Sequence, residues 1–106
     1  MDSALQAILS ELRLRLERLY GQRLASLVLY GSQARADAEP GSDIDVLVVL
    51  EGAVDPGREI ARTESDVADL CLTHGVVLTC LFVSREQFAE EQSPLLINVR
   101  REGVTV

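Results

Sequence analysis

Lysine and tryptophan are both absent from this sequence of 106 residues, so all ten of its basic side chains are arginines. Seventeen acidic residues outnumber them, and the formal net charge is −7. Nucleic-acid-binding surfaces are normally basic, and anionic membranes attract basic segments. The acidic balance therefore argues against direct nucleic-acid binding and against an anionic membrane partner.

Cysteines and long apolar runs are also scarce. Cys71 and Cys80 do not have the Cys-x-x-Cys spacing of a metal site, and their apolar surroundings favour free thiols over a disulfide. The start of the chain is polar, and no apolar stretch is long enough to span a membrane. The sequence therefore predicts a cytoplasmic protein.

Aromatic residues are few, with two Phe and two Tyr, although 47% of the chain is hydrophobic. A core must therefore be built from Leu, Val, Ile and Ala. A chain of this length fits one compact domain. We expect a single domain over residues 1–106.

The pattern of apolar and turn residues predicts alternating helices and strands. Ser3 is a candidate N-cap for a first helix that ends at Gly21. Ser84, with Gln87 three residues later, has the pattern of a capping box for a short helix through Phe88. The remaining expected elements are strands over 25–30, 44–50 and 76–83, a helix over 57–74, and a last helix over 95–101 that Gly103 ends.

Helical spacing also predicts which side chains face the core. On the helix over 57–74, Asp66 and Asp69 are expected to face solvent, and His74 is expected to cap the C-terminal end. The strand over 76–83 is apolar enough to predict burial on both faces. The predicted core positions of the two long helices are Leu5, Ile8, Leu9, Leu12, Leu16, Leu19, Ile60, Val67, Leu70 and Cys71.

Two carboxylates at the start of the second strand carry the strongest functional signal. Asp43 and Asp45 are one residue apart, so a strand would direct both side chains to one face. Their Cα atoms would lie roughly 6.5 Å apart. Mg²⁺ is commonly bound by one or two carboxylates together with substrate phosphates. The pair therefore predicts a site for a divalent metal and a phosphate compound.

A Gly-Ser pair follows the first strand and could bind those phosphates. Gly31 permits a sharp turn and a close approach of the ligand to the backbone. Ser32 would open a short helix, whose free N–H groups favour an anion. Arg35 could reach the same anion or brace the loop, and Ser42 would support the loop before Asp43.

Each of these features also has an ordinary structural interpretation. Gly-Ser after a strand is usually only a turn, Asp-x-Asp at a strand start is often solvated, and Arg35 alone would be a surface residue. Their conjunction is more informative: strand, Gly-Ser, short helix, Ser-Asp-x-Asp and strand follow in order, with ten residues between Ser32 and Asp43.

This pattern over residues 24–52 resembles the signature of the polymerase-beta-like nucleotidyltransferase superfamily, and more narrowly the minimal nucleotidyltransferase (MNT) domain. The segment over 98–103 also resembles small members of the family. The resemblance implies an α/β (α+β) fold with a small mixed sheet and helices packed mainly on one face.

The resemblance also implies a function. MNT proteins are commonly paired with a small helical HEPN toxin, an RNase, and transfer AMP from ATP to a tyrosine of the toxin. By this resemblance Asp43 and Asp45 would be catalytic and bind Mg²⁺ or Mn²⁺, while Gly31, Ser32, Arg35 and Ser42 would bind ATP. The protein would then act as an antitoxin; self-association into a homo-oligomer stays open.

One part of the family pattern is missing. Active members carry a third carboxylate on the strand beside Asp-x-Asp, but residues 76–83 contain no acid, and Thr79 is their clearly polar side chain. Glu86 and Glu90 come only after that strand. A slow enzyme, an enzyme completed by a partner and an antitoxin that only binds all remain open. Transfer to a small molecule such as an aminoglycoside is least favoured, because no acceptor domain is evident.

Overall fold

The computed structural model describes residues 2–39 and 41–106. Helices and strands follow the order predicted from the sequence, and the last strand is an addition. The loop predicted over 36–42 contains Pro40, which lies outside the described residues. The elements are α1 (Ser3–Tyr20), η1 (Gly21–Arg23), β1 (Leu24–Tyr30), α2 (Ser32–Arg35), β2 (Ile44–Leu50), α3 (Pro56–His74), β3 (Leu78–Ser84), α4 (Arg85–Glu90), α5 (Pro94–Glu102) and β4 (Val104–Thr105).

The strands form one mixed sheet in the order β3-β2-β1-β4. β1 pairs antiparallel with both β2 and β4, whereas β2 and β3 run parallel. The parallel connection requires a crossover, which α3 supplies. The mixed α/β architecture expected from the sequence is therefore confirmed.

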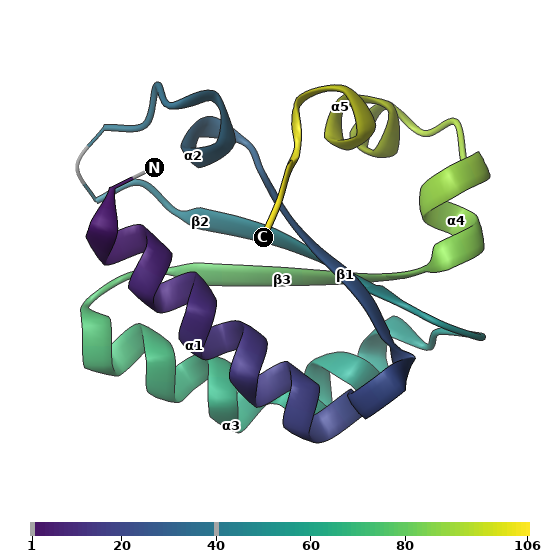
Figure 1. Cartoon of the computed structure of the whole chain (residues 1–106), viewed down its shortest axis with the longest axis horizontal. Coiled ribbons are helices and arrows are strands. Elements are labelled where there is room, and N and C mark those ends of the chain that lie inside the picture. Colours follow the sequence, from purple (N-terminus) through teal and green to yellow (C-terminus); the bar gives the residue numbers. More distant parts are fainter. Residues whose placement is uncertain (1, 40) are drawn as a thin grey trace.

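Alternating side chains of the strands build a core on each face of the sheet. On one face α1 and α3 pack against Leu29, Val46 and Val48. On the other face Leu47 and Val49 pack with residues of α5. Figure 1 shows this arrangement, with α1 and α3 below the sheet and α2, α4 and α5 above it. The two long helices thus cover one face, as predicted, while short helices cover part of the other.

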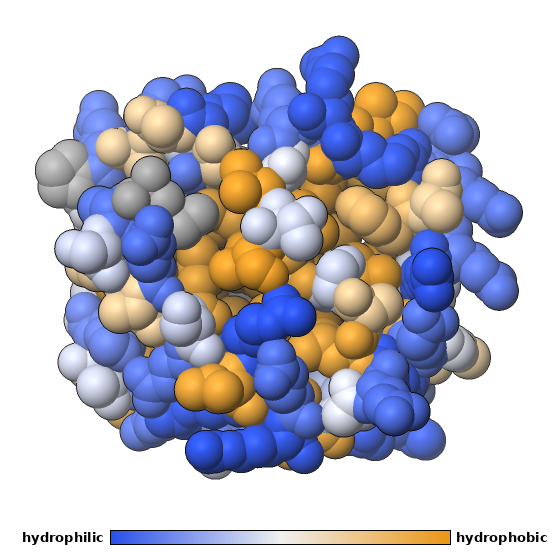
Figure 2. Space-filling view, viewed as in Figure 1, coloured by the Kyte–Doolittle hydropathy of each residue, from blue (hydrophilic) through white to orange (hydrophobic). Residues whose placement is uncertain are grey.

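Apolar surface remains outside these cores. In the view of Figure 2, apolar side chains gather between α1 and α5 and are surrounded by hydrophilic ones. None of the helices in the described part of the chain is both long and apolar enough to cross a membrane.

Side-chain caps fix where the helices begin. Asp2, rather than the predicted Ser3, caps α1 by accepting from the Leu5 N–H. Asp55 caps α3, which begins at Pro56, one residue before the predicted start. The capping box of Ser84 and Gln87 is confirmed at α4, which extends to Glu90. Each of these two helices therefore begins one residue before its predicted start, a typical boundary error.

The predicted burial of the third strand on both faces is wrong. β3 lies at an edge of the sheet and has β2 as its neighbour. Thr79 is exposed, while Cys80, Leu81 and Val83 are only half-buried. An apolar composition is typical of a strand between two neighbours, but the composition does not determine the position of a strand in the sheet. Cys71 and Cys80 are free thiols, as predicted.

The predicted inner face of α3 is partly wrong. Ile60 is 51% exposed, whereas Glu59 beside it is only 2% exposed. The Tyr20 hydroxyl donates to the Glu59 carboxylate at 2.7 Å, and Arg23 forms an ion pair with it at 3.4 Å. A buried carboxylate is tolerated when such partners surround it. On α1, Tyr20 is likewise buried while the predicted Leu19 is 39% exposed.

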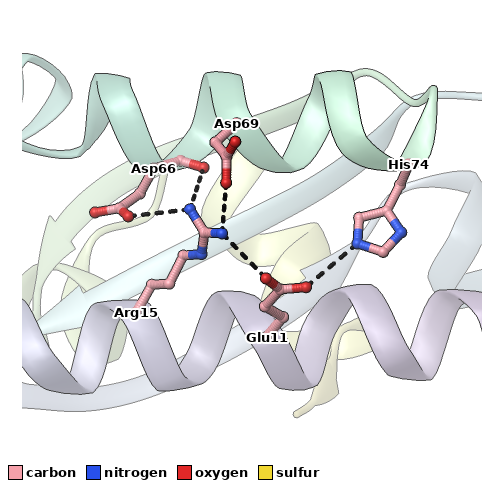
Figure 3. A network of polar contacts seen from close by, with 5 residues as sticks. All are labelled: Glu11, Arg15, Asp66, Asp69 and His74. Atoms are coloured by element: carbon pink, nitrogen blue, oxygen red, sulfur yellow. Dashed lines mark hydrogen bonds and ion pairs between the residues drawn. The ribbon is translucent and has the colours of Figure 1, made fainter.

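An ionic network joins α1 to α3 through Asp66 and Asp69 (Figure 3). Asp69 is exposed, as predicted, whereas Asp66 is half-buried. The Arg15 guanidinium lies 3.2 Å from Asp66, 2.6 Å from Asp69 and 3.0 Å from Glu11. His74 contacts the other oxygen of Glu11 at 3.3 Å. The cap of α3 is the left-handed Gly75 rather than His74.

Candidate functional site

Three side chains form a row across one end of the sheet. Asp45 on β2 is in register with Tyr30 on β1 and with Thr79 on β3. Because registered residues point to the same face, all three share the face that carries Leu47 and Val49. This row places a half-buried carboxylate between a tyrosine and a threonine at the end of the sheet.

Asp43 lies just before β2 and is exposed. The pKa of the Asp45 carboxyl is raised above its ordinary value of 3.8, first by burial and second by the charge of Asp43. In the described part of the chain, neither carboxylate takes part in an ion pair. The end of the sheet therefore carries two interacting negative charges that the protein itself does not neutralise.

Gly31 shapes the turn against which Asp45 lies. Its φ of +75° belongs to a region that residues with a side chain rarely adopt. A Cβ atom at this position would stand 2.7 Å from Oδ2 of Asp45, closer than real contacts allow. Glycine is therefore required here both by the backbone and by the position of the carboxylate.

Ser32 and Ser42 both precede Asp43 and Asp45 in the chain, and the structure links the segments in which they lie. Ser32 is the first residue of α2, directly after Gly31. The Gln33 side-chain amide donates to the Ser42 carbonyl oxygen at 3.2 Å. Gln33 therefore ties α2 to the segment before Asp43. No sequence signal identified Gln33, because this bond depends on the path of the loop.

Arg35 is directed elsewhere. Its side chain is exposed and forms ion pairs with Asp37 at 3.2 Å and with Glu102, at the end of α5, at 3.5 Å. Both carboxylates raise the pKa of the Arg35 guanidinium, Asp37 more than Glu102. The structure thus shows Arg35 bracing the loop against α5 rather than contacting Asp43 or Asp45.

The C-terminal segment is held close to β1 by a second glycine. A Cβ atom at Gly103 would stand 2.5 Å from Cγ1 of Val28 and 2.5 Å from the Val99 carbonyl oxygen. This close approach allows the chain to turn from α5 into β4, which pairs with β1. It also places Glu102 within reach of Arg35.

The donor set fits a hard divalent cation that brings other ligands with it. Carboxylate oxygens are preferred ligands of Mg²⁺, which usually keeps waters or substrate phosphates in its coordination shell. Among residues 2–39 and 41–106, no group of three or more His, Cys, Asp or Glu side chains is arranged to hold a metal. Asp43 and Asp45 could therefore bind such an ion together with a phosphate compound.

The register places Thr79 beside Asp45, where the strand next to Asp-x-Asp would supply a third carboxylate. β3 contains no acid, and Glu86 and Glu90 lie on α4, after that strand has ended. The third carboxylate that the sequence lacks would therefore lie at the position of Thr79, whose side chain carries a hydroxyl group.

Comparisons with known proteins identify the family of this chain. The family model described as "Nucleotidyltransferase domain" matches residues 9–97. A protein of Methanocaldococcus jannaschii named "Putative protein adenylyltransferase" is 38% identical over 77 residues, which cover 69% of this chain and 67% of that protein.

The fold is also similar to a chain in a solved structure described as "Crystal structure of the toxin-antitoxin with AMP-PNP". The TM-score is 0.61 at 22% identity, and the match covers 88% of this chain and 68% of that one. At this identity the likeness concerns the fold. The family match over residues 9–97 and the archaeal relative establish that this chain belongs to the nucleotidyltransferase domain family.

Proposed function

We propose that this nucleotidyltransferase transfers AMP from ATP to a hydroxyl group of a partner protein. The observation that carries the proposal is the pair of interacting, unneutralised carboxylates at Asp43 and Asp45, packed against the glycine turn at Gly31. The name of the archaeal relative, a protein adenylyltransferase, favours AMP and a protein acceptor over other nucleotides and small molecules.

The site residues have distinct roles in this proposal. Asp43 and Asp45 would hold Mg²⁺ or Mn²⁺, which when bound offsets the negative charge of the triphosphate. Gly31 and Ser32 would receive the phosphates, because the turn lets a ligand approach the backbone closely. Arg35 and Ser42 support the loop, Arg35 through Asp37 and Glu102 and Ser42 through its carbonyl oxygen.

In the proposed reaction, a hydroxyl oxygen of the acceptor attacks the α-phosphorus of ATP. A bond forms between that oxygen and the phosphorus, the bond to the β-phosphate bridge breaks, and pyrophosphate leaves. The acceptor hydroxyl loses its proton to solvent or to a basic group of the partner, since β3 supplies no carboxylate for this step. Positioning of the two reactants is then the main contribution of this chain.

The proposed acceptor is a HEPN toxin in the cytoplasm, and the protein would be its antitoxin. The structural neighbour is itself part of a toxin–antitoxin structure. A second candidate function is that of a binding antitoxin, which would neutralise the toxin without transferring AMP to it. Thr79, which cannot act as a carboxylate base, stands beside Asp45 where the third carboxylate would lie. General-base catalysis is worth about 10²–10⁴-fold, so its loss favours the alternative of binding alone.

Mass spectrometry of the partner separates the two functions. The protein is incubated with ATP, Mg²⁺ and a purified HEPN partner, and toxin activity is measured in parallel. Transfer predicts a gain of one or more AMP units, which Asp43→Asn abolishes. Glu39→Gln is the matched control, because Glu39 is an exposed acid of the same loop. Neutralised toxin of unchanged mass, in wild type and Asp43→Asn alike, would establish binding instead.

A further inference from the structure

The short helix α2 is fixed at both ends beside the candidate site. It follows Gly31, whose backbone lies against the Asp45 carboxylate. The Gly31 carbonyl oxygen accepts from the N–H groups of Ala34 and Arg35, at 3.1 and 3.2 Å. At the other end of α2, Arg35 forms its ion pair with Glu102 of α5. A side chain on α2 is therefore held at a defined place relative to Asp45.

Gln33 is the side chain of α2 that reaches the segment before β2. Its amide nitrogen donates to the Ser42 carbonyl oxygen at 3.2 Å. Because a carbonyl oxygen can only accept, the NH₂ group of the amide must be the part that faces it. Gln33 is half-buried. In the described part of the chain, no other side chain forms a hydrogen bond or an ion pair with Ser42 or Asp43.

Asp43 stands between two anchored peptide groups. A peptide group is planar, so the bond to the Ser42 carbonyl oxygen also orients the N–H of Asp43. On the other side of Asp43, the Ile44 N–H donates to the Val77 carbonyl oxygen at 2.9 Å. That bond orients the peptide group to which the Asp43 carbonyl belongs. Both backbone torsions of Asp43 are therefore restrained, although the residue is exposed.

The two anchors differ in what a substitution can do to them. The bond of the Ile44 N–H joins backbone to backbone beside the pairing of β2 with β3. The Ser42 N–H donates to the Glu39 carbonyl oxygen at 3.0 Å, but this bond lies within the loop. The bond from Gln33 is made by a side chain, so one substitution can remove it without changing the pairing of the strands.

We propose that Gln33 is a positioning residue for the metal site, which keeps the Asp43 carboxylate beside that of Asp45 by holding the Ser42 carbonyl oxygen. The inference rests on the proposed function, because it concerns the divalent cation that the two carboxylates would share. Gln33 acts through Asp43 and is not itself a ligand. It orders the backbone of Asp43 before the ion arrives, so that binding does not have to supply the entropy cost of that ordering.

The size of the effect follows from the loss of one hydrogen bond. The net contribution of such a bond corresponds to a change of about three- to tenfold in an equilibrium constant. The Kd of the metal should rise by this factor when Gln33 loses its donor. Asp45 should keep its place, because it belongs to β2 and is paired with β1 and β3.

Binding of Mn²⁺ alone, measured from the relaxation rate of water protons, tests the proposal without nucleotide or acceptor. Gln33→Met keeps the length of the side chain and removes the donor, so the Mn²⁺ Kd should rise about three- to tenfold. Gln92→Met is the matched control, because the Gln92 amide donates to the Glu90 carbonyl oxygen at 3.3 Å, in the segment after α4. It should leave the Kd unchanged. Circular dichroism and thermal unfolding confirm that each variant is folded.

A double-mutant cycle separates positioning from a general structural role. If Gln33 acts through Asp43, Gln33→Met should weaken Mn²⁺ binding in the wild type but cause no further loss in Asp43→Asn. A merely structural role would weaken binding by the same factor in both backgrounds, because the remaining carboxylate of Asp45 would be disturbed as well.

Three outcomes overturn the role of Gln33 and leave the proposed function intact, provided that Asp43→Asn itself weakens Mn²⁺ binding. These are an unchanged Kd in Gln33→Met, an equal loss in Gln92→Met, and an equal loss from Gln33→Met in the wild-type and Asp43→Asn backgrounds. A wild type whose Mn²⁺ binding does not depend on Asp43 would overturn the metal site, and with it both the proposed function and the role of Gln33.

Discussion

The carboxylate of Asp45 lies against the backbone of Gly31, so that a single added methyl group at Gly31 would stand 2.7 Å from Oδ2. Gly31, in the turn after β1, and Asp45, on β2, therefore determine each other's position.

Gly31→Ala is expected to displace the Asp45 carboxylate. The substitution adds left-handed strain of about 1–3 kcal/mol and an overlap with Oδ2, so it should destabilise the fold and reduce stabilisation by ATP with Mg²⁺. Gly52→Ala is the matched control: its φ of +80° is similar, but its Cβ would meet nothing within 4 Å. Thermal unfolding with and without ligand measures both effects. Equal ligand shifts in the two variants would contradict the role of the contact.

Mg²⁺ with ATP is expected to stabilise the wild type, because a ligand bound only to the native state shifts unfolding. At about 100 times the dissociation constant the gain is about 2.7 kcal/mol, or roughly 10 °C or more for a domain of this size. Asp43→Asn combined with Asp45→Asn should keep the fold and lose the shift. A double variant that retains the full shift would remove both carboxylates from the proposed site.

In the metal-free protein, Asp43→Asn should lower the pKa of Asp45 but leave it above 3.8, because burial remains when the neighbouring charge is removed. The raised pKa means that the native state holds this proton more tightly than the unfolded chain. Ionisation of Asp45 thus lowers stability as the pH rises above 3.8, and Asp43→Asn should reduce that loss. NMR titration of the carboxyl carbon measures the change, and Asp43→Glu, which keeps the charge, should leave the pKa raised.

Thr79→Asp would place a third carboxylate in register with Asp45. If the proposed transfer occurs, the rate of AMP transfer should rise by at least about tenfold, since general-base catalysis contributes about 10²–10⁴-fold. Thr79→Asn controls for size and polarity without the charge. A rate that is unchanged in Thr79→Asp, under conditions where wild type transfers AMP, would show that this position does not limit the reaction.

Arg15→Gln should destabilise the protein more than Arg13→Gln. Arg15 faces three carboxylates from α1 and α3, whereas Arg13 forms one ion pair, with Glu17, and donates to the Val106 carbonyl oxygen. Removal of Arg15 leaves the three acids to repel one another, so Tm should fall by a few degrees. The fall should be smaller at high salt, because salt screens the repulsion between exposed charges. Arg15 and His74 hold the pKa of Glu11 below 4.5. That stabilisation is present above pH 4.5 and is lost as the pH falls through the lowered pKa. Equal losses in both variants would contradict the network.

Local sequence patterns predicted the elements well, for identifiable reasons. The capping box at Ser84 and the glycine end at Gly21 act within a few residues, so the sequence contains the whole interaction. Asp45 shares a face of the sheet with Leu47 and Val49, as the period of a strand requires. The motif over residues 24–52 also pointed to the family that the comparisons then established.

Contacts between residues far apart in the sequence could not be predicted from local patterns. Ile60 is exposed and Glu59 is buried, contrary to their polarity, because Tyr20 and Arg23, some 40 residues earlier, contact the Glu59 carboxylate. β3 is apolar yet lies at an edge, because strand order depends on how all the strands pair. Arg35 finds Glu102 only through the close approach at Gly103.

The sequence by itself determined the residues of the candidate site, since turn geometry and strand period act between near neighbours. The tertiary structure decided which residues surround that site: Tyr30 and Thr79 beside Asp45, Gln33 bound to Ser42, and the open β3 edge. These contacts depend on the register of paired strands and on chain crossings, which join residues far apart in the sequence through packing of the whole domain.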